Sequence, residues 1–158
     1  MTVRQIRMFG DPVLREAAAP VTTFDRELRD LVRSLTATMR AGAGRAGLAA
    51  PQLGVPLRVI VYDVDGRAGH IVNPRLERSG RTVVADEACL SAPGVWWPRE
   101  RSFSAVARGR DMYGKPVTVR AIAMLARVLQ HEADHLDGVL FIDDLPAEDQ
   151  RRFLAAIP

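Results

Sequence analysis

The residues best suited to chemistry lie together near the C-terminal end of this 158-residue chain. His131, Glu132 and His135 form an H-E-x-x-H pattern inside a segment whose apolar spacing predicts a helix over residues 122–136. Because residues four apart share one helix face, both imidazoles can reach one cation. Glu132 is one step round from His131, where its carboxylate can contact a water on that cation. The pattern therefore predicts a metal-dependent hydrolase with Glu132 as general base.

Two histidines leave a tetrahedral catalytic site one protein ligand short. The acidic residues that follow His135 do not stand at the spacing that zinc proteases use for a third ligand. Cys89 is the single cysteine, so it forms no internal disulfide, and its thiolate could complete the site. A small, inert, buried side chain is the alternative interpretation of a lone cysteine. The residues around it decide between the two.

Three separated motifs resemble those of the peptide deformylase family, in the same order. Residues 87–91 read E-A-C-L-S, close to E-G-C-L-S; residues 131–135 fit H-E-x-D-H; and residues 47–52 read G-L-A-A-P-Q. The similarity covers nearly the whole chain and includes G-D-P-V-L at residues 10–14. It implies an enzyme that removes the formyl group from the N-terminal formylmethionine of nascent polypeptides. It also makes Cys89 the third metal ligand beside the two histidines.

The resemblance implies roles for residues around the metal. A metal-bound water would attack the formyl carbon while Glu132 takes its proton and passes it to the departing amine. The Gln52 side-chain amide and the Leu90 backbone N–H would stabilise the oxyanion, although an ordinary loop glutamine is the alternative for Gln52. Fe²⁺ is the expected metal, with Zn²⁺, Ni²⁺ or Co²⁺ able to occupy the site. Residue types alone favour zinc.

The formylated peptide is expected to pair with the chain near Gly47 as an added strand. An apolar pocket should receive the methionine side chain, and core packing is the alternative for each candidate. The candidates are Val128, Leu129, Trp96 and Trp97. Arg99 stands where the family usually has arginine, and we expect it to pair with Glu87 and steady the cysteine loop. A surface arginine is the competing interpretation.

Two glycines of the family pattern are replaced. Arg45 stands at the first glycine of the G-x-G-L-A-A motif, and Ala88 stands directly before the cysteine. Glycine at such positions often permits a positive φ or the close approach of a ligand backbone. Ala88 adds only a methyl group, whereas Arg45 adds bulk and charge at the rim of the expected peptide cleft. We expect retained activity with altered peptide or inhibitor binding, as in a specialised second deformylase.

Two further helices are expected besides the helix that carries H-E-x-x-H. Apolar residues at helical spacing predict a helix over residues 25–39, with Thr22 or Thr23 as its cap. A short C-terminal helix is expected over residues 146–156, capped by Asp144. Gly138 is expected to terminate the H-E-x-x-H helix.

The middle of the chain predicts β structure. A strand is expected at residues 57–63, and a second begins at 71–72 before a turn at Asn73 and Pro74. Residues 102–119 predict a hairpin with its turn at 113–115. The class is therefore α+β, with antiparallel β-sheets surrounding a central helix that carries H-E-x-x-H, an N-terminal helix and a short C-terminal helix.

The composition fits one globular catalytic domain over residues 1–158, with 47% hydrophobic and 26% charged residues. The sequence contains no apolar run that predicts a signal peptide or a membrane span, so we expect a cytoplasmic protein with no membrane partner. The net charge of +3 comes from scattered arginines, which favours a solvated surface over specific nucleic-acid binding. We expect a monomer that contacts the ribosome transiently. A peptidase with the same H-E-x-x-H geometry and a binding protein with a vestigial site are the rival interpretations.

Overall fold

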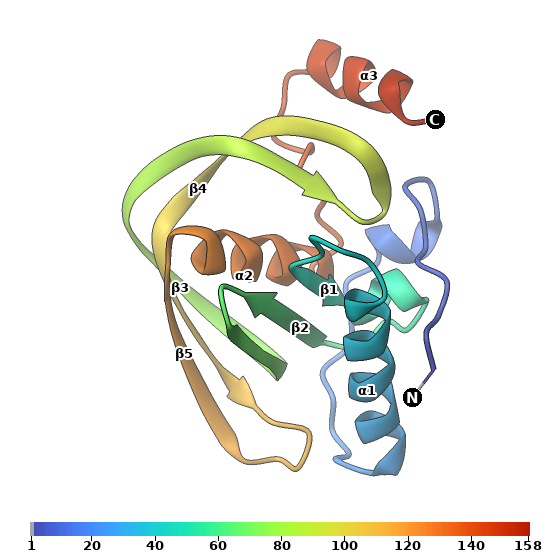
Figure 1. The fold of residues 1–158 in the computed structure, drawn as a ribbon, viewed down its shortest axis with the longest axis vertical. Coiled ribbons are helices and arrows are strands. Elements are labelled where there is room, and N and C mark those ends of the chain that lie inside the picture. Colours follow the sequence, from blue (N-terminus) through green and yellow to red (C-terminus); the bar gives the residue numbers. More distant parts are fainter. Residues whose placement is uncertain (1) are drawn as a thin grey trace.

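The computed structural model describes residues 2–158, which form three α-helices, two short 3-10 helices and five strands (Figure 1). In chain order these elements are η1 (Pro12–Arg15), α1 (Arg26–Arg40), β1 (Gly47–Ala49), η2 (Ala50–Leu53), β2 (Val59–Val64), β3 (Arg67–Cys89), β4 (Ala92–Arg110), β5 (Pro116–Ile122), α2 (Ala123–Leu136) and α3 (Ala147–Ala156).

The five strands pair in chain order, and every pairing is antiparallel. In Figure 1, β3 and β4 arch around α2, and α2 contacts all five strands. The α+β class and the antiparallel pairing are thus confirmed, but the expected several sheets are one sheet among the described residues. The reason is the length of β3, whose 23 residues join the part beside β2 to the part beside β4 alone.

Two details of the predicted strands differ in the structure. Asn73 and Pro74 do not end the strand, because β3 runs through them to Cys89. Asn73 instead takes a positive φ of 53°, and the register with β4 shifts between Val72 and Arg75, as at a β-bulge. The hairpin predicted over residues 102–119 is confirmed, since β4 and β5 pair closely on either side of the turn.

The core lies on both sides of the first strands. Buried side chains of α1, including Leu35 and Met39, pack on one side of β2, and Leu125 and Leu129 of α2 pack on the other. The helix predicted over residues 25–39 is confirmed within one residue, but its cap is Asp25 rather than Thr22 or Thr23. A side-chain oxygen of Asp25 accepts a hydrogen bond from the Leu28 N–H at 3.0 Å, because Asp25 directly precedes the first helical residue.

The end of α2 and the last helix complete the fold. Gly138 has a φ of +71° just beyond α2, and a Cβ there would lie 2.5 Å from the Arg15 carbonyl oxygen. The terminal helix α3 lies within one residue of its predicted range, but Asp144 does not cap it. Asp144 instead forms an ion pair with Arg99 at 2.7 Å. Among residues 2–158, no helix has both the length and the hydropathy needed to cross a membrane.

Candidate metal centre

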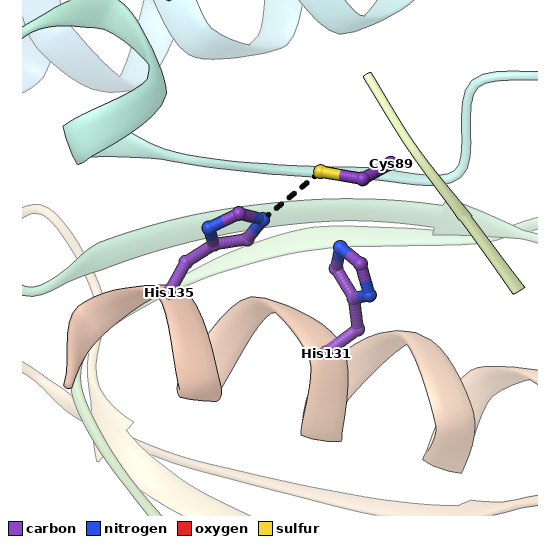
Figure 2. Close-up of side chains that lie close together, drawn as sticks. All are labelled: Cys89, His131 and His135. Carbon is purple, nitrogen blue, oxygen red and sulfur yellow. Dashed lines mark hydrogen bonds between the residues drawn. The ribbon is translucent and has the colours of Figure 1, made fainter. Parts of the chain in front are cut away.

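The three side chains predicted as ligands lie together in the structure. His131 and His135 project from the same side of α2 toward Cys89, which ends β3 (Figure 2). Their possible ligand atoms all lie within 4.8 Å of one another, and the Cys89 Sγ is 3.3 Å from the His135 Nε2. Donors of one tetrahedral site at ordinary metal–ligand lengths are roughly 3.3–3.8 Å apart. The arrangement therefore fits a single cation held by one thiolate and two imidazoles.

The ring of His131 is oriented by a carboxylate behind it. Its Nδ1 lies 2.6 Å from Oε2 of Glu87, so an N–H at Nδ1 can donate to the carboxylate and leave Nε2 free as a ligand. Burial lowers the pKa of His131, but hydrogen bonds to Cys89 and Glu87 outweigh it and place the pKa well above its ordinary value. A cation must displace that proton, so metal binding is expected to weaken as pH falls.

Glu87 is the centre of a buried ionic network that sequence reasoning did not find. Arg101 donates to both of its carboxylate oxygens, at 3.1 and 2.8 Å, and Arg127 donates at 3.2 Å. Burial alone would raise the pKa of Glu87, but the hydrogen bonds from His131 and Arg101 hold it well below its usual range. Arg101 also forms an ion pair with Asp134, the neighbour of His135 in the sequence. The network thus joins both histidine segments of α2 to the strand that carries Cys89.

Glu132 lies beside the ligands with its carboxyl group buried. Its Oε2 has no hydrogen-bond partner within residues 2–158. Burial raises the pKa of Glu132 to about 7, against the lowering effect of His131. A carboxyl group with this pKa can accept and release a proton near neutral pH. Gly47 faces it, and a methyl group there would lie 2.8 Å from both Oε1 of Glu132 and Cγ1 of Val128.

A cavity of about 620 Å³ opens beside these residues. Its lining includes several residues predicted to contact substrate or metal, namely Arg45, Gly47, Cys89, Leu90, Trp96, Val128, His131 and Glu132. Trp96 is 64% exposed, so it stands at the mouth rather than in the core. The volume suits the side chain and adjoining backbone of a peptide.

Three predicted substrate-site residues lie elsewhere. Leu129 is fully buried in the core between α2 and the sheet, because it faces the opposite side of α2 from the cavity. Trp97 packs edge-on against Phe153 of α3. Arg99 does not pair with Glu87, since its ion-pair partner is Asp144; the arginine that pairs with Glu87 from β4 is Arg101. Successive residues of a strand face opposite ways, which accounts for the different positions of Trp96 and Trp97. Arg99 and Arg101 share a face of β4, so what separates them is their place along the strand, opposite Ala85 and Val83.

Gln52 is buried behind the cysteine rather than on the cavity wall. Its Nε2 donates to the Ser91 Oγ at 3.1 Å and lies 3.7 Å from the Cys89 Sγ. Its Oε1 accepts from the Ala49 N–H at 2.9 Å, which fixes the direction in which the amide points. The side chain therefore holds a donor close to the sulfur of the candidate ligand.

The two replaced glycines cause no backbone strain. Asp65, Asn73 and Ala123 are the non-glycine residues with positive φ among the described residues, so Ala88 and Arg45 both have ordinary backbone angles. The Arg45 guanidinium turns back to the end of α1, where Nη1 donates to the Thr38 carbonyl at 2.7 Å. Arg45 thus ties the loop at the cavity rim to α1, as well as adding bulk there.

Sequence and structure comparisons agree on one family. The model of the polypeptide deformylase family matches residues 3–151. A peptide deformylase of Acidothermus cellulolyticus is 55% identical over 157 residues, which cover 99% of this chain and 87% of that protein. The crystal structure of the Thermotoga maritima peptide deformylase is 41% identical with a TM-score of 0.86, covering 90% of this chain and 97% of that one. The Synechococcus elongatus enzyme, solved with actinonin, is 36% identical with a TM-score of 0.89, over 96% and 84% of the two chains. The chain therefore belongs to the polypeptide deformylase family.

Proposed function

We propose that this peptide deformylase removes the formyl group of N-terminal formylmethionine at a cation held by Cys89, His131 and His135. The observation that carries the proposal is the approach of three possible ligand atoms within 4.8 Å of one another beside the buried carboxyl group of Glu132. We expect α2 to be the central helix of one catalytic domain over residues 1–158, with its H-E-x-x-H residues facing the peptide.

The chemistry needs a nucleophile, a base and a place for developing charge. A bound divalent cation, Fe²⁺ by expectation, with Zn²⁺, Ni²⁺ or Co²⁺ as alternatives, would acidify a water molecule and polarise the formyl oxygen. Glu132 takes the proton of the attacking water on its carboxylate and delivers it to the amine as the C–N bond breaks. Burial of the carboxyl group raises its pKa, which favours acceptance of that proton.

The developing oxyanion needs donors near Cys89. Leu90 follows the cysteine and lines the cavity, so its backbone N–H is a candidate. The Gln52 amide is the other candidate, because its Nε2 already lies 3.7 Å from the cysteine sulfur. Loss of one such donor typically costs about 10²–10³ in rate. Because Gln52 also bonds Ser91, its replacement should change the cysteine loop as well.

The peptide has an open strand edge available to it. β1 is the terminal strand of the sheet, paired only with β2 among the described strands, and Gly47 lines the cavity at its start. A formylated peptide can add to this edge through main-chain hydrogen bonds, which require little side-chain specificity. Val128 then lies at the cavity wall, where the methionine side chain would contact it.

Arg45 is the residue by which this chain would differ from deformylases with glycine at that position. Its bond to Thr38 restrains the loop that forms part of the cavity rim. We expect Arg45→Gly to keep the rate of formyl-Met-Ala-Ser hydrolysis at saturation and to change KM and the affinity for hydroxamate inhibitors. Identical constants for both proteins would remove any basis for a specialised paralogue.

The biological setting follows from the substrate. Formylated nascent peptides appear on ribosomes, so we propose a cytoplasmic monomer that contacts the ribosome transiently. No membrane partner and no specific nucleic-acid sequence are expected. The net positive charge of the chain is compatible with a weak attraction to RNA.

The deciding experiment is an anaerobic formate-release assay with metal analysis on the same sample. We expect formate from formyl-methionyl peptides in proportion to bound metal. Metal-loaded protein that releases none would favour the vestigial-site alternative. Cys89→Ala distinguishes the proposed deformylase from the peptidase alternative, because a peptidase with another third ligand should keep its metal and its activity. We expect the variant to lose both.

A further inference from the structure

A group of arginines lies on the outer face of the sheet where β3, β4 and β5 pair. Cross-strand partners share a face of the sheet, and on the side away from α2 the register places Arg75 opposite Arg108, and Val106 opposite Arg120. Arg110 is two residues further along β4 on the same face. We call Arg75, Arg108, Arg110 and Arg120 the arginine face; all four are exposed.

The charge of the arginine face is concentrated rather than scattered. Glu77 is the acidic residue at the outward positions of β3 between Arg75 and Ser79, and it pairs with Arg108 at 3.0 Å. Four arginines and one glutamate give a net charge of +3, which equals the net charge of the whole chain. The other charged residues therefore balance one another.

The arrangement of these arginines lowers the stability of the fold, so stability does not explain why they lie together. Like charges directly opposite each other on neighbouring strands destabilise a sheet, and Arg75 faces Arg108 in this way. Arg75, Arg110 and Arg120 form no ion pair with another described residue. α1 packs on this side of the sheet over β1 and β2. The β4–β5 turn approaches the start of α1, where Arg29 lies over Tyr113, and the rest of β5 extends away from α1 in Figure 1.

We propose that the arginine face is a docking surface for the phosphate backbone of RNA. Diagonal neighbours on a sheet lie roughly 7–8 Å apart, so several guanidinium groups can meet successive phosphates of one strand. Their neighbours on β4 and β5, Val106 and Thr118, have short side chains, which lets a backbone approach closely. Membrane docking relies on apolar side chains that enter the lipid, and Ile122 is the large exposed apolar residue among these outward positions.

This surface would act apart from the metal centre, although its use rests on the proposed function. A nascent chain emerges from a particle whose surface is largely RNA, so a face that binds RNA without sequence preference would raise the local concentration of formylated termini. None of the four arginines lines the cavity. Their replacement should therefore leave hydrolysis of a free formyl peptide unchanged.

The test compares two double variants with equal loss of charge. Arg75→Gln with Arg120→Gln changes the arginine face, and Arg26→Gln with Arg33→Gln changes exposed arginines on α1 as the control. Binding of a fluorescein-labelled 20-nucleotide single-stranded RNA and of purified bacterial ribosomes is measured over a range of salt concentrations. Formate release from formyl-Met-Ala-Ser by the metal-loaded proteins reports fold and activity independently.

We expect the first variant to lose roughly fivefold to tenfold in affinity for RNA, and the slope of log affinity against log salt to fall by about 1.4, at about 0.7 per lost phosphate contact. The control should keep both, and all proteins should release formate alike. Equal losses in the two variants, an unchanged first variant, or a wild-type slope near zero would overturn the proposal. So would tight binding to phosphatidylserine vesicles with none to RNA. If no protein released formate while RNA binding followed the expected pattern, the proposed function would fail and the docking surface would stand.

Discussion

Replacing Glu87 with glutamine should damage the metal centre from a position that touches no metal. The carboxylate is 6% exposed and receives hydrogen bonds from Arg101, Arg127 and His131. Glutamine has nearly the same shape but carries no charge, so Arg127 loses its acidic partner and Arg101 keeps only Asp134. An NH₂ group facing His131 would also favour the imidazole tautomer that carries its proton on Nε2, where the ligand lone pair is needed.

The size of this effect follows from burial. Breaking a buried ion pair by removing one partner costs about 3–5 kcal/mol, because the remaining charge stays buried without compensation. We expect the free energy of unfolding of Glu87→Gln to fall by about that amount. Loss of a hydrogen-bond partner behind a metal ligand typically costs about 10–100-fold in metal affinity or activity. The first loss is measured by urea denaturation of the metal-free proteins and the second by competition with a chelator.

Glu148→Gln provides the matched control. Glu148 pairs with Arg152 at 3.0 Å on the surface of α3, with 68% of its side chain exposed. The same chemical change there should cost less than about 1 kcal/mol and leave metal affinity unchanged. If Glu87→Gln were no less stable than Glu148→Gln and held metal as tightly as the wild type, the role assigned to the network would be refuted.

Three further outcomes test the geometry. Gly47→Ala should lower kcat/KM for formyl peptides by at least about tenfold with a small change in stability, because its methyl group would meet the ends of the Glu132 and Val128 side chains. Unchanged kinetics would show that the close contact of Gly47 with these two side chains does not matter for catalysis. Gly138→Ala should lose about 2–4 kcal/mol of unfolding free energy in urea denaturation, since it combines a positive φ with a contact of 2.5 Å to backbone. Gly10 also has a positive φ but has open space around it, so Gly10→Ala should lose only about 1–2 kcal/mol of unfolding free energy. Equal losses in the two variants would show that the close contact between position 138 and the Arg15 backbone costs nothing. Chelator competition should show metal affinity falling as pH drops below neutrality, because the Cys89 thiol and both histidines must be deprotonated to bind; a flat profile would contradict this ligand set.

The sequence predicted the parts of the site that local patterns encode. His131 and His135 stand four residues apart on one helix, so their shared direction follows from helix geometry alone. Cys89 lies far away in the sequence, and only the motif around it suggested that it joins them. The cavity lining at Gly47 and Val128 followed from the same motifs.

The ionic network could not be predicted because nothing local marks its members. Arg101 and Arg127 are two of 22 basic residues, and their burial depends on how β4 crosses α2. Arg99 was assigned to Glu87 from family position, yet its ion-pair partner is Asp144, which lies in the segment that follows α2 and is far away in the sequence. Because Arg99 and Arg101 share a face of β4, the alternation of the strand could not have chosen between them.

The same limit applies to the fold. Asn73 and Pro74 are typical turn residues, but a positive φ is also what a β-bulge accepts, and only pairing with β4 decides between them. Local sequence patterns therefore could not predict the length of β3. For the same reason they could not predict that the strands join into one sheet. Asp25 and the threonines before it are all good caps, so the choice among them depended on where the helix begins.

The central claim is that Glu132 moves the proton at a cation held by Cys89 and the two histidines. Glu132→Gln tests it most directly, with metal content and formate release measured on the same anaerobic sample. We predict that the variant keeps its metal, because Glu132 is not a ligand, and loses at least about 100-fold in the rate of formyl-Met-Ala-Ser hydrolysis. A metal-loaded variant that hydrolyses the peptide at the wild-type rate would contradict the account.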